Sequence, residues 1–346
     1  MRQELKMQGV SKLRILHVTN YSLTPKPPGY FGVPYKITNG LIRLGHNVLP
    51  FADRDMARYL NIFKSRKFGR KPVNRKLLEV VSEFVPDLVL FGHADMIEPD
   101  TLRKIREELP TVKLAQWNVD PLFTPDNIDR INSKIDLVDA TFCSTSGPLL
   151  EKLSQGKYNT YFMPNPVDLS IERHRNFEKS LDQFPFGFGM AVGNPNGIRN
   201  IGGEDFIVKN LINEIIQSQP DIRTIFPGFT APNVTGKQYD EFLAQIPISL
   251  NFSRRNDVYH YSSDRISHTI GNGILTFVDR AMGLNEIFEE NEIAFFSDKN
   301  EFLSKLAYFI KNDSERQSIA EAGWKKYHSN FNEKNIAKDI IEKTYK

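Results

Sequence analysis

Short apolar runs alternate along the first half of the chain with stretches whose apolar residues recur at helical spacing. The runs predict strands at residues 13–19, 47–51, 87–91, 112–117, 140–144 and 160–162. Strands that alternate with amphipathic helices are typical of a parallel sheet covered by helices on its faces. We therefore predict an α/β fold for this half.

The same alternation returns in the second half, after a segment that interrupts it. Residues 163–168, Met-Pro-Asn-Pro-Val-Asp, contain two prolines and predict a hinge. Further strands are expected at 186–192, 223–226, 246–252, 273–278 and 293–296, and helices at 299–311, 313–328 and 333–345. We predict an N-terminal Rossmann-like domain at 1–165, a C-terminal one at 171–330, and a C-terminal helix, 331–346, that packs back toward the first domain.

Length and composition fit this division. A chain of 346 residues, 40% hydrophobic and 25% charged, exceeds what one core usually organises. No apolar run reaches the roughly 18 residues needed to cross a bilayer, and the N-terminus is polar, so we expect a cytoplasmic protein. The one cysteine, Cys143, excludes a disulfide framework and a cysteine-rich zinc site, and its apolar strand predicts a packing role.

The charge is distributed unevenly. The net charge of +3 is too weak to indicate nucleic acid. Residues 58–76, however, contain no acidic residue, three interleaved aromatic residues and eight basic ones: Arg58, Lys64, Arg66, Lys67, Arg70, Lys71, Arg75 and Lys76. This tract is open to three interpretations: a membrane patch, a nucleic-acid patch or a solvated loop.

Residues 267–288 carry a family resemblance. This segment, which includes Arg-Ala-Met-Gly-Leu-Asn-Glu-Ile at 280–287, resembles without a gap the donor-binding segment of group 1 glycosyltransferases. Tyr-Ser-Ser-Asp-Arg at 261–265 resembles the subfamily typified by the spore maturation protein CgeB. Residues 28–32, 40–48 and 161–168 are similar to the family's glycine loop, its step into the second strand and its hinge. The resemblance implies the GT-B fold, in which two Rossmann-like domains face a cleft.

The resemblance implies that the C-terminal domain binds a nucleotide-diphosphate sugar. Backbone N–H groups at glycine turns and cationic side chains are suited to a diphosphate. The candidates are Gly193, Asn194, Gly271, Asn272, Gly273, Arg199, Arg254, Arg255, Tyr261, Arg265, His268 and Glu286. Arg254 and Arg255 directly follow an expected strand and rank above Arg199. The alternative is that the glycines only end elements and that the arginines are solvated.

The sequence departs from the family at two positions. Retaining members carry two glutamates eight residues apart, where this chain has His260 and His268. The resemblance therefore leaves the retaining or inverting outcome open. Glu286 occupies the position that in the family faces the nucleotide ribose.

The acceptor side is expected on the N-terminal domain. Asp120, Asp95 and His93 follow expected strands and are candidates for the base that takes the acceptor proton; each Asp could instead cap the next helix. Gly29, Tyr30 and Gly32 form the expected acceptor loop. Asp-Arg-Asp at 53–55 imitates a metal-binding motif, but the resemblance implies neither metal nor cofactor, and we interpret it as a surface turn.

These features predict a glycosyltransferase. The donor would be a nucleotide-diphosphate sugar, and the acceptor a glycan, lipid-linked glycan or protein. Because related enzymes that act on lipid-linked glycans often lie on the anionic inner membrane face, the tract 58–76 favours peripheral membrane contact there over nucleic acid. The rivals are a nucleotide-sugar epimerase-like hydrolase and an inactive binding or scaffold protein of the same fold.

Overall fold

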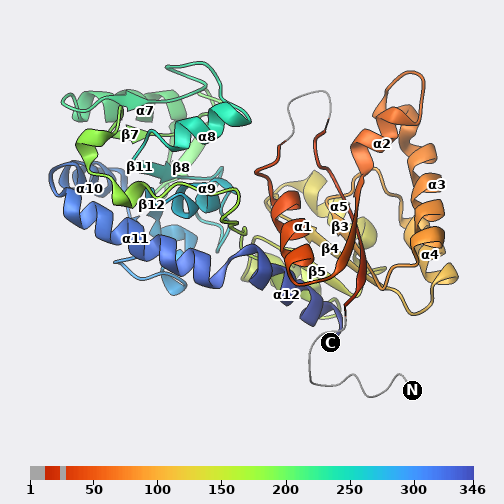
Figure 1. The fold of residues 1–346 in the computed structure, drawn as a ribbon. Coiled ribbons are helices and arrows are strands. Elements are labelled where there is room, and N and C mark those ends of the chain that lie inside the picture. The colour runs from red at the N-terminus through yellow and green to blue at the C-terminus, as the bar shows by residue number, and fades with distance from the viewer. Residues whose placement is uncertain (1–11, 24–28) are drawn as a thin grey trace. The chain divides into compact units, whose positions relative to one another are not determined.

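The computed structural model describes residues 12–23 and 29–346, which divide into two compact units (Figure 1). Unit 1 comprises residues up to 143, 149–163 and 333–346; unit 2 comprises 144–148 and 164–332. Pro28 of the predicted glycine loop and the polar N-terminus lie outside the described residues. No helix in the described ranges is both long enough and apolar enough to span a bilayer.

Unit 1 is built on a parallel sheet of six strands, as the hydrophobic pattern predicts. The strands are β1 (Arg14–Thr19), β2 (Asn47–Ala52), β3 (Leu88–Gly92), β4 (Lys113–Asn118), β5 (Ala140–Cys143) and β6 (Thr160–Phe162). Their order is β2-β1-β3-β4-β5-β6. The order reverses between β1 and β3, and doubly wound sheets bind ligands at such a point, beyond the carboxyl ends of the strands.

Helices cover both faces of this sheet, because the apolar residues of each helix lie along one side that packs against the strands. They are α1 (Val33–Arg43), α2 (Asp53–Tyr59), α3 (Arg66–Phe84), α4 (Pro99–Glu108), α5 (Pro125–Ile135), α6 (Pro148–Ser154) and α12 (Glu333–Thr344). Figure 1 shows α12, the last helix of the chain, beside α1.

The close approach of α1 and α12 depends on one glycine. A Cβ at Gly40 would lie 2.0 Å from the carbonyl oxygen of Glu333, so a larger residue would push the helices apart. Arg43 also forms an ion pair of 2.7 Å with the Glu333 carboxylate. The C-terminal helix is thus an integral part of the unit 1 core, where Ile336, Ala337 and Ile340 are buried.

Unit 2 has shorter strands. They are β7 (Phe188–Gly189), β8 (Ile198–Ile201), β9 (Glu204–Ile207), β10 (Thr224–Ile225), β11 (Ile248–Asn251), β12 (Leu275–Asp279) and β13 (Ala294–Phe296). β11, β12 and β13 pair in parallel, as do β7 and β10. β8 and β9 form an antiparallel hairpin that the sequence pattern did not predict, and the strand expected at 186–192 shrinks to two residues.

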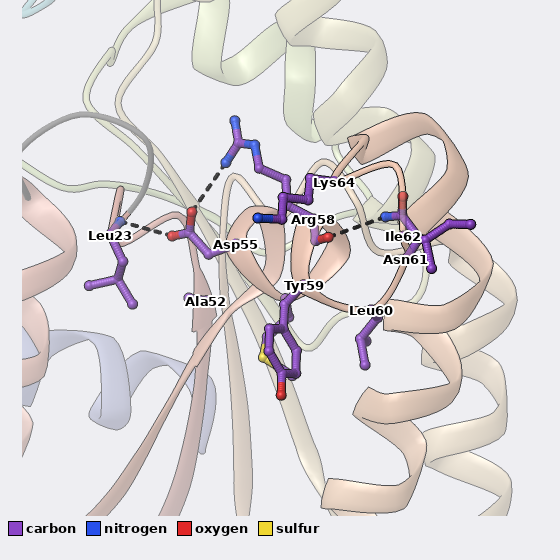
Figure 2. Close-up of a pocket in the computed structure, with 10 residues that line it drawn as sticks. Leu23, Ala52, Asp55, Arg58, Tyr59, Leu60, Asn61, Ile62 and Lys64 are labelled. Atoms are coloured by element: carbon purple, nitrogen blue, oxygen red, sulfur yellow. Dashed lines mark hydrogen bonds and ion pairs between the residues drawn. The ribbon is translucent and has the colours of Figure 1, made fainter.

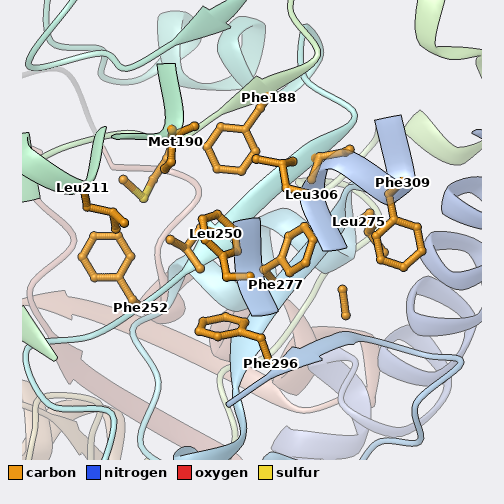
Figure 3. Packing of buried hydrophobic residues seen from close by; sticks show 14 of the residues in the cluster. Phe188, Met190, Leu211, Leu250, Phe252, Leu275, Phe277, Phe296, Leu306 and Phe309 are labelled. Carbon is orange, nitrogen blue, oxygen red and sulfur yellow. The ribbon is translucent and has the colours of Figure 1, made fainter. Parts of the chain in front are cut away.

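The core of unit 2 is rich in phenylalanine. Helices α7 (Val208–Ser218), α8 (Lys237–Leu243), α9 (Arg265–Gly271), α10 (Lys299–Lys311) and α11 (Asp313–Asn330) surround the strands. Figure 3 shows Phe188, Phe277 and Phe296 packed with Leu306 of α10. The Phe277 and Phe302 rings meet edge to face at 5.0 Å, a geometry that adds stability beyond the buried area.

Candidate functional site

Three arginines gather after the carboxyl ends of β7 and β11 in unit 2. Arg199 lies on β8, Arg254 follows β11, and Arg265 begins α9. Burial, and then the charges of Arg265 and Arg254, lower the pKa of Arg199, so the three groups repel one another. Within residues 12–23 and 29–346, none of the three has a carboxylate within ion-pair distance. A cluster of cations without counter-charge is suited to an anionic ligand.

Arg255 stands apart from this cluster. It forms a two-point ion pair with Asp257 at 2.9 and 2.5 Å and is largely exposed. The geometry therefore groups Arg199 with Arg254 and reverses the order in which the sequence ranked Arg199 and Arg255. Tyr261, also predicted, is buried beside the cluster and contributes to the electrostatic environment of Arg199.

Asp279, at the end of β12, holds in place the two segments that carry Arg199 and Arg254. The sequence did not single it out. Its fully buried carboxylate accepts hydrogen bonds from the backbone N–H of Gly202 (2.9 Å) and from the Asn256 side chain (3.3 Å). The first bond ties the tip of the β8–β9 hairpin, and the second ties the loop after β11. The hairpin and that loop carry Arg199 and Arg254.

The predicted glycine turns differ from each other. Gly193 and Asn194 are exposed, and a Cβ at Gly193 would meet nothing within 4 Å. Gly271, Asn272 and Gly273 are buried: a Cβ at Gly271 would lie 2.8 Å from Glu172, and one at Gly273 would lie 2.5 Å from Phe177. Their close contacts are with protein, so packing accounts for these glycines and we leave 271–273 out of the candidate site.

His268 also makes its contacts with protein groups. Its Nδ1–H donates to the Glu172 carboxylate at 2.8 Å, and both side chains are buried. The other Glu172 oxygen accepts from the Asp168 backbone N–H at 2.8 Å. His268 thus joins α9 to the segment after the predicted hinge, which is a structural role, and Glu172 was not anticipated from the sequence.

His260 and Glu286 belong to a second, more accessible group. The His260 Nε2–H donates to the carbonyl of Gly283 (3.1 Å), which leaves Nδ1 to accept from the Ser146 hydroxyl (2.8 Å). His260 stacks on Tyr259 at 4.0 Å, and the Tyr259 hydroxyl donates to the exposed Glu286 carboxylate. Burial lowers the pKa of His260, which favours this neutral tautomer.

In unit 1 the structure brings the candidate bases together. His93 and Asp120 follow β3 and β4, and the His93 Nδ1 lies 3.3 Å from the Asp120 carboxylate. Arg130 of α5 donates to the same Asp120 oxygen at 2.7 Å, while about half of the Asp120 side chain is exposed. Burial lowers the pKa of His93 to about 4, so at neutral pH the imidazole is uncharged and its Nδ1–H faces the Asp120 carboxylate.

Gly92 and Trp117 fix the turn that carries His93. A Cβ at Gly92 would lie 2.1 Å from the Trp117 ring, so only glycine lets the turn rest there. The His93 ring meets Trp117 edge to face at 5.6 Å. His93 and Ala94 both have positive φ, at 58° and 39°, and such strain is commonly found at functional sites.

Asp95 is held differently from Asp120. Burial acts to raise the pKa of Asp95, but the hydrogen bond and charge of Arg54, at 2.7 Å, outweigh it and leave the pKa below its ordinary value. Neither carboxylate caps a helix, because Glu98 and Thr124 are the N-cap residues of α4 and α5. The capping alternative is therefore wrong.

The predicted surface turn at 53–55 is also wrong. Asp53 begins α2 and is fully buried, where its carboxylate accepts from the Met96 backbone N–H at 3.3 Å. Burial, and then the charge of Asp95, raise the pKa of Asp53 to about 6. Among the residues described, no three His, Cys, Asp or Glu side chains cluster as metal ligands would.

The predicted acceptor loop precedes α1, at the same edge of the sheet as His93 and Asp120 in strand order. Gly32 is the N-cap of α1, and its N–H donates to the Gly29 carbonyl at 2.9 Å. Tyr30 is exposed at 39% and packs edge to face on Phe31.

Comparison with known proteins agrees with this architecture. Residues 210–342 match the family model described as glycosyl transferase-like. A sequence comparison with curated proteins finds no match. The sucrose-phosphate synthase of Thermosynechococcus elongatus has a similar structure, with TM-score 0.61 and 10% identity over 96% of this chain and 98% of that one.

Two further solved structures are similar. The HepE protein of Anabaena, in complex with UDP and glucose, has TM-score 0.57 and 14% identity, covering 95% of this chain and 98% of its own. AviGT4, a glycosyltransferase involved in avilamycin A biosynthesis, has TM-score 0.56 and 14% identity, covering 96% and 97%. The fold is therefore that of the GT-B glycosyltransferases, as the sequence predicts.

Proposed function

We propose that this chain is a glycosyltransferase that uses a nucleotide-diphosphate sugar. The observation that carries the proposal is the cluster of Arg199, Arg254 and Arg265, three cations without a carboxylate partner in the described part of the chain. A diphosphate offers the negative charge that the cluster lacks, and two or more arginines can bind its oxygens with charge-assisted hydrogen bonds. The HepE structure contains UDP, so UDP is the first nucleotide to test.

The proposed transfer divides the work between two sets of residues. The acceptor hydroxyl oxygen bonds to the anomeric carbon while the bond from that carbon to the diphosphate breaks. The arginine cluster offsets the charge that builds on the departing diphosphate. The acceptor proton passes to the His93–Asp120 pair, in which the carboxylate faces solvent and the imidazole is neutral. Glu286 is assigned to the ribose by the family resemblance.

The finer assignments follow the sequence. We propose a metal-independent enzyme of the CgeB-like subfamily in the cytoplasm. Its acceptor would be a glycan, lipid-linked glycan or protein, and the basic tract at 58–76 favours an acceptor at the inner membrane face.

The test combines calorimetry with turnover. Titration with UDP, ADP and GDP should show binding of at least one, and a panel of the corresponding nucleotide sugars should be hydrolysed or transferred. Excess EDTA should leave the rate unchanged if no metal takes part. Absence of both nucleotide binding and turnover would overturn the proposal.

A second candidate is a non-catalytic binding protein. It is favoured by one observation: the family's glutamate positions hold His260 and His268, and His268 is buried in its pair with Glu172. Nucleotide binding without turnover on any donor would support this candidate. Release of free sugar without any acceptor would instead support the epimerase-like hydrolase.

A further inference from the structure

The connection between α2 and α3 exposes large apolar side chains. Tyr59, at the end of α2, is 81% exposed, Ile62 is 89% exposed and Phe63 is 68% exposed. Phe68, on the first turns of α3, is 60% exposed, and its ring lies 5.2 Å from that of Phe63. Figure 1 shows this connection at the outer end of the two helices. We call residues 59–71 the tip. Large apolar side chains that are exposed together in this way mark interaction sites.

The tip is held in shape by polar contacts and close packing. The Asn61 side chain donates to the carbonyls of Ala57 (2.6 Å) and Ser65 (2.8 Å) and accepts from the Ser65 N–H (3.1 Å). A Cβ at Gly69 would lie 1.7 Å from the Ala57 carbonyl oxygen, so α2 and α3 touch there. The fold itself therefore presents the apolar side chains outward.

Positive charge surrounds the apolar side chains and is not neutralised. Of the basic residues in the tract, Arg58 and Lys76 have ion-pair partners in Asp55 and Glu79. In the described part of the chain, six others have no ion-pair partner: Lys64, Arg66, Lys67, Arg70, Lys71 and Arg75. All six lie at the surface. A surface that combines apolar side chains with unpaired cations is complementary to anionic headgroups above acyl chains.

A hollow of about 1210 Å³ adjoins the tip (Figure 2). At the border of the hollow, Figure 2 shows the Asp55 carboxylate between the Leu23 backbone N–H and the Arg58 guanidinium. Its apolar lining consists of Leu23, Ala52, Met56, Tyr59, Leu60 and Ile62. The hollow extends the apolar surface inward from the tip and has the volume to take part of an acyl chain.

We propose that the tip docks on the surface of an anionic bilayer, with Tyr59, Ile62 and Phe63 inserted at the boundary between the headgroups and the acyl chains. A single-stranded nucleic acid also fits the charge, and bases stack on aromatic rings. The most exposed of the large apolar side chains, however, is the aliphatic Ile62, and the Phe63 and Phe68 rings lie against each other, which favours a bilayer. The inference builds on the proposed function in one respect: docking would bring the enzyme to lipid-linked acceptors.

The charge is tested with two variants of equal net charge. The first is Lys64→Glu with Lys67→Glu and Lys71→Glu. The control is Lys237→Glu with Lys311→Glu and Lys325→Glu, three surface lysines of unit 2. Both are sedimented with phosphatidylcholine vesicles, with and without phosphatidylglycerol. Wild type and control should bind only the anionic vesicles. The tip variant should bind them on the order of a hundredfold more weakly, since each basic residue contributes about fivefold.

Insertion is tested with tryptophan as a depth probe. Ile62→Trp should be quenched by lipids brominated on the acyl chains, whereas Leu169→Trp, at an exposed site of unit 2, should not. The two natural tryptophans give a background that wild type measures. No binding by wild type, equal binding by both charge variants, or equal quenching of both probes would overturn the proposal. Binding to RNA that Ile62→Ser leaves intact, without vesicle binding, would assign the surface to a polyanion instead.

Nucleotide binding in solution separates this inference from the proposed function. The tip variant should bind UDP as wild type does, because its substitutions lie in unit 1 and the arginine cluster lies in unit 2. Vesicle binding with no nucleotide binding would overturn the glycosyltransferase and leave the membrane surface standing.

Discussion

At the carboxyl edge of the unit 1 sheet, Arg54 lies 2.7 Å from Asp95 and Arg130 lies 2.7 Å from Asp120. At the corresponding edge of unit 2, three arginines repel one another without a carboxylate partner among the described residues. The two units thus differ in charge pairing: the arginines of the first edge are paired with carboxylates, and, within residues 12–23 and 29–346, those three of the second are not. The first edge is already neutral and suits an uncharged acceptor whose proton must be moved. The arginine cluster at the second edge gains a counter-charge when an anion binds, and in this proposal it takes the donor.

The largest expected effect is on the proton-accepting side. Asp120→Asn removes the charge that orients His93 and should lower the transfer rate by about 10²–10⁴-fold, the usual contribution of a general base. Asp95→Asn is the matched control because Asp95, like Asp120, pairs with an arginine, but the carboxylate within ion-pair distance of His93 is that of Asp120; the control should cost less than about tenfold. Rates are measured at saturating donor, with UDP affinity checked for both. The opposite order of effects would make Asp95 the base.

The next effect separates paired from unpaired arginines. Arg254→Gln should weaken UDP binding by about 10–100-fold, because a charge-assisted hydrogen bond is lost. Arg255→Gln, one residue along and paired with Asp257, should change it little. Calorimetry at two salt concentrations measures both. Equal losses in the two variants would show that pairing with a carboxylate does not decide which arginine binds the nucleotide.

The smallest effect is a dependence of stability on pH in unit 1. The pKa of His93 falls from 6.5 to about 4 on folding. Between these values the unfolded chain binds a proton that the folded chain does not, so stability rises as pH increases from about 4 to 6.5. His93→Gln should flatten this rise by on the order of 1–2 kcal/mol, less than the full shift implies because Asp120 is half exposed. Urea unfolding across this range measures it, and an unchanged slope would show that folding does not lower the pKa of His93.

The sequence predicted the fold well because its main signal is local. A strand of unit 1 such as β3 is buried on both faces, and a run of apolar residues announces it. The β8–β9 hairpin was not predicted because its strands are only four residues long and mix polar with apolar residues, although the Gly202-Gly203 pair at its tip is a hairpin signal.

The candidate site was predicted only in part because pairing is not local. Arg254 was predicted from its place after a strand, and Arg265 as one of the cations available in the donor-binding domain. Whether a charged side chain is paired can depend on distant residues: His268 meets Glu172 across 96 positions, although the partner of Arg255, Asp257, lies only two residues on. Asp279 was missed for the same reason, since its role appears only when the hairpin folds over β12.

The packing of α12 on α1 has a consequence for synthesis of the chain. Ile37 and Leu41 of α1 share a core with Ile336 and Ile340, which the ribosome makes after residues 164–332 of unit 2. Unit 1 begins first, yet it cannot complete that core until all of unit 2 has been translated. During that interval its apolar helix surface stays uncovered, as an opening for chaperones or for aggregation. Unit 1 therefore starts before unit 2 but completes its core after it. Removal of α12 would leave the apolar surface of α1 permanently uncovered.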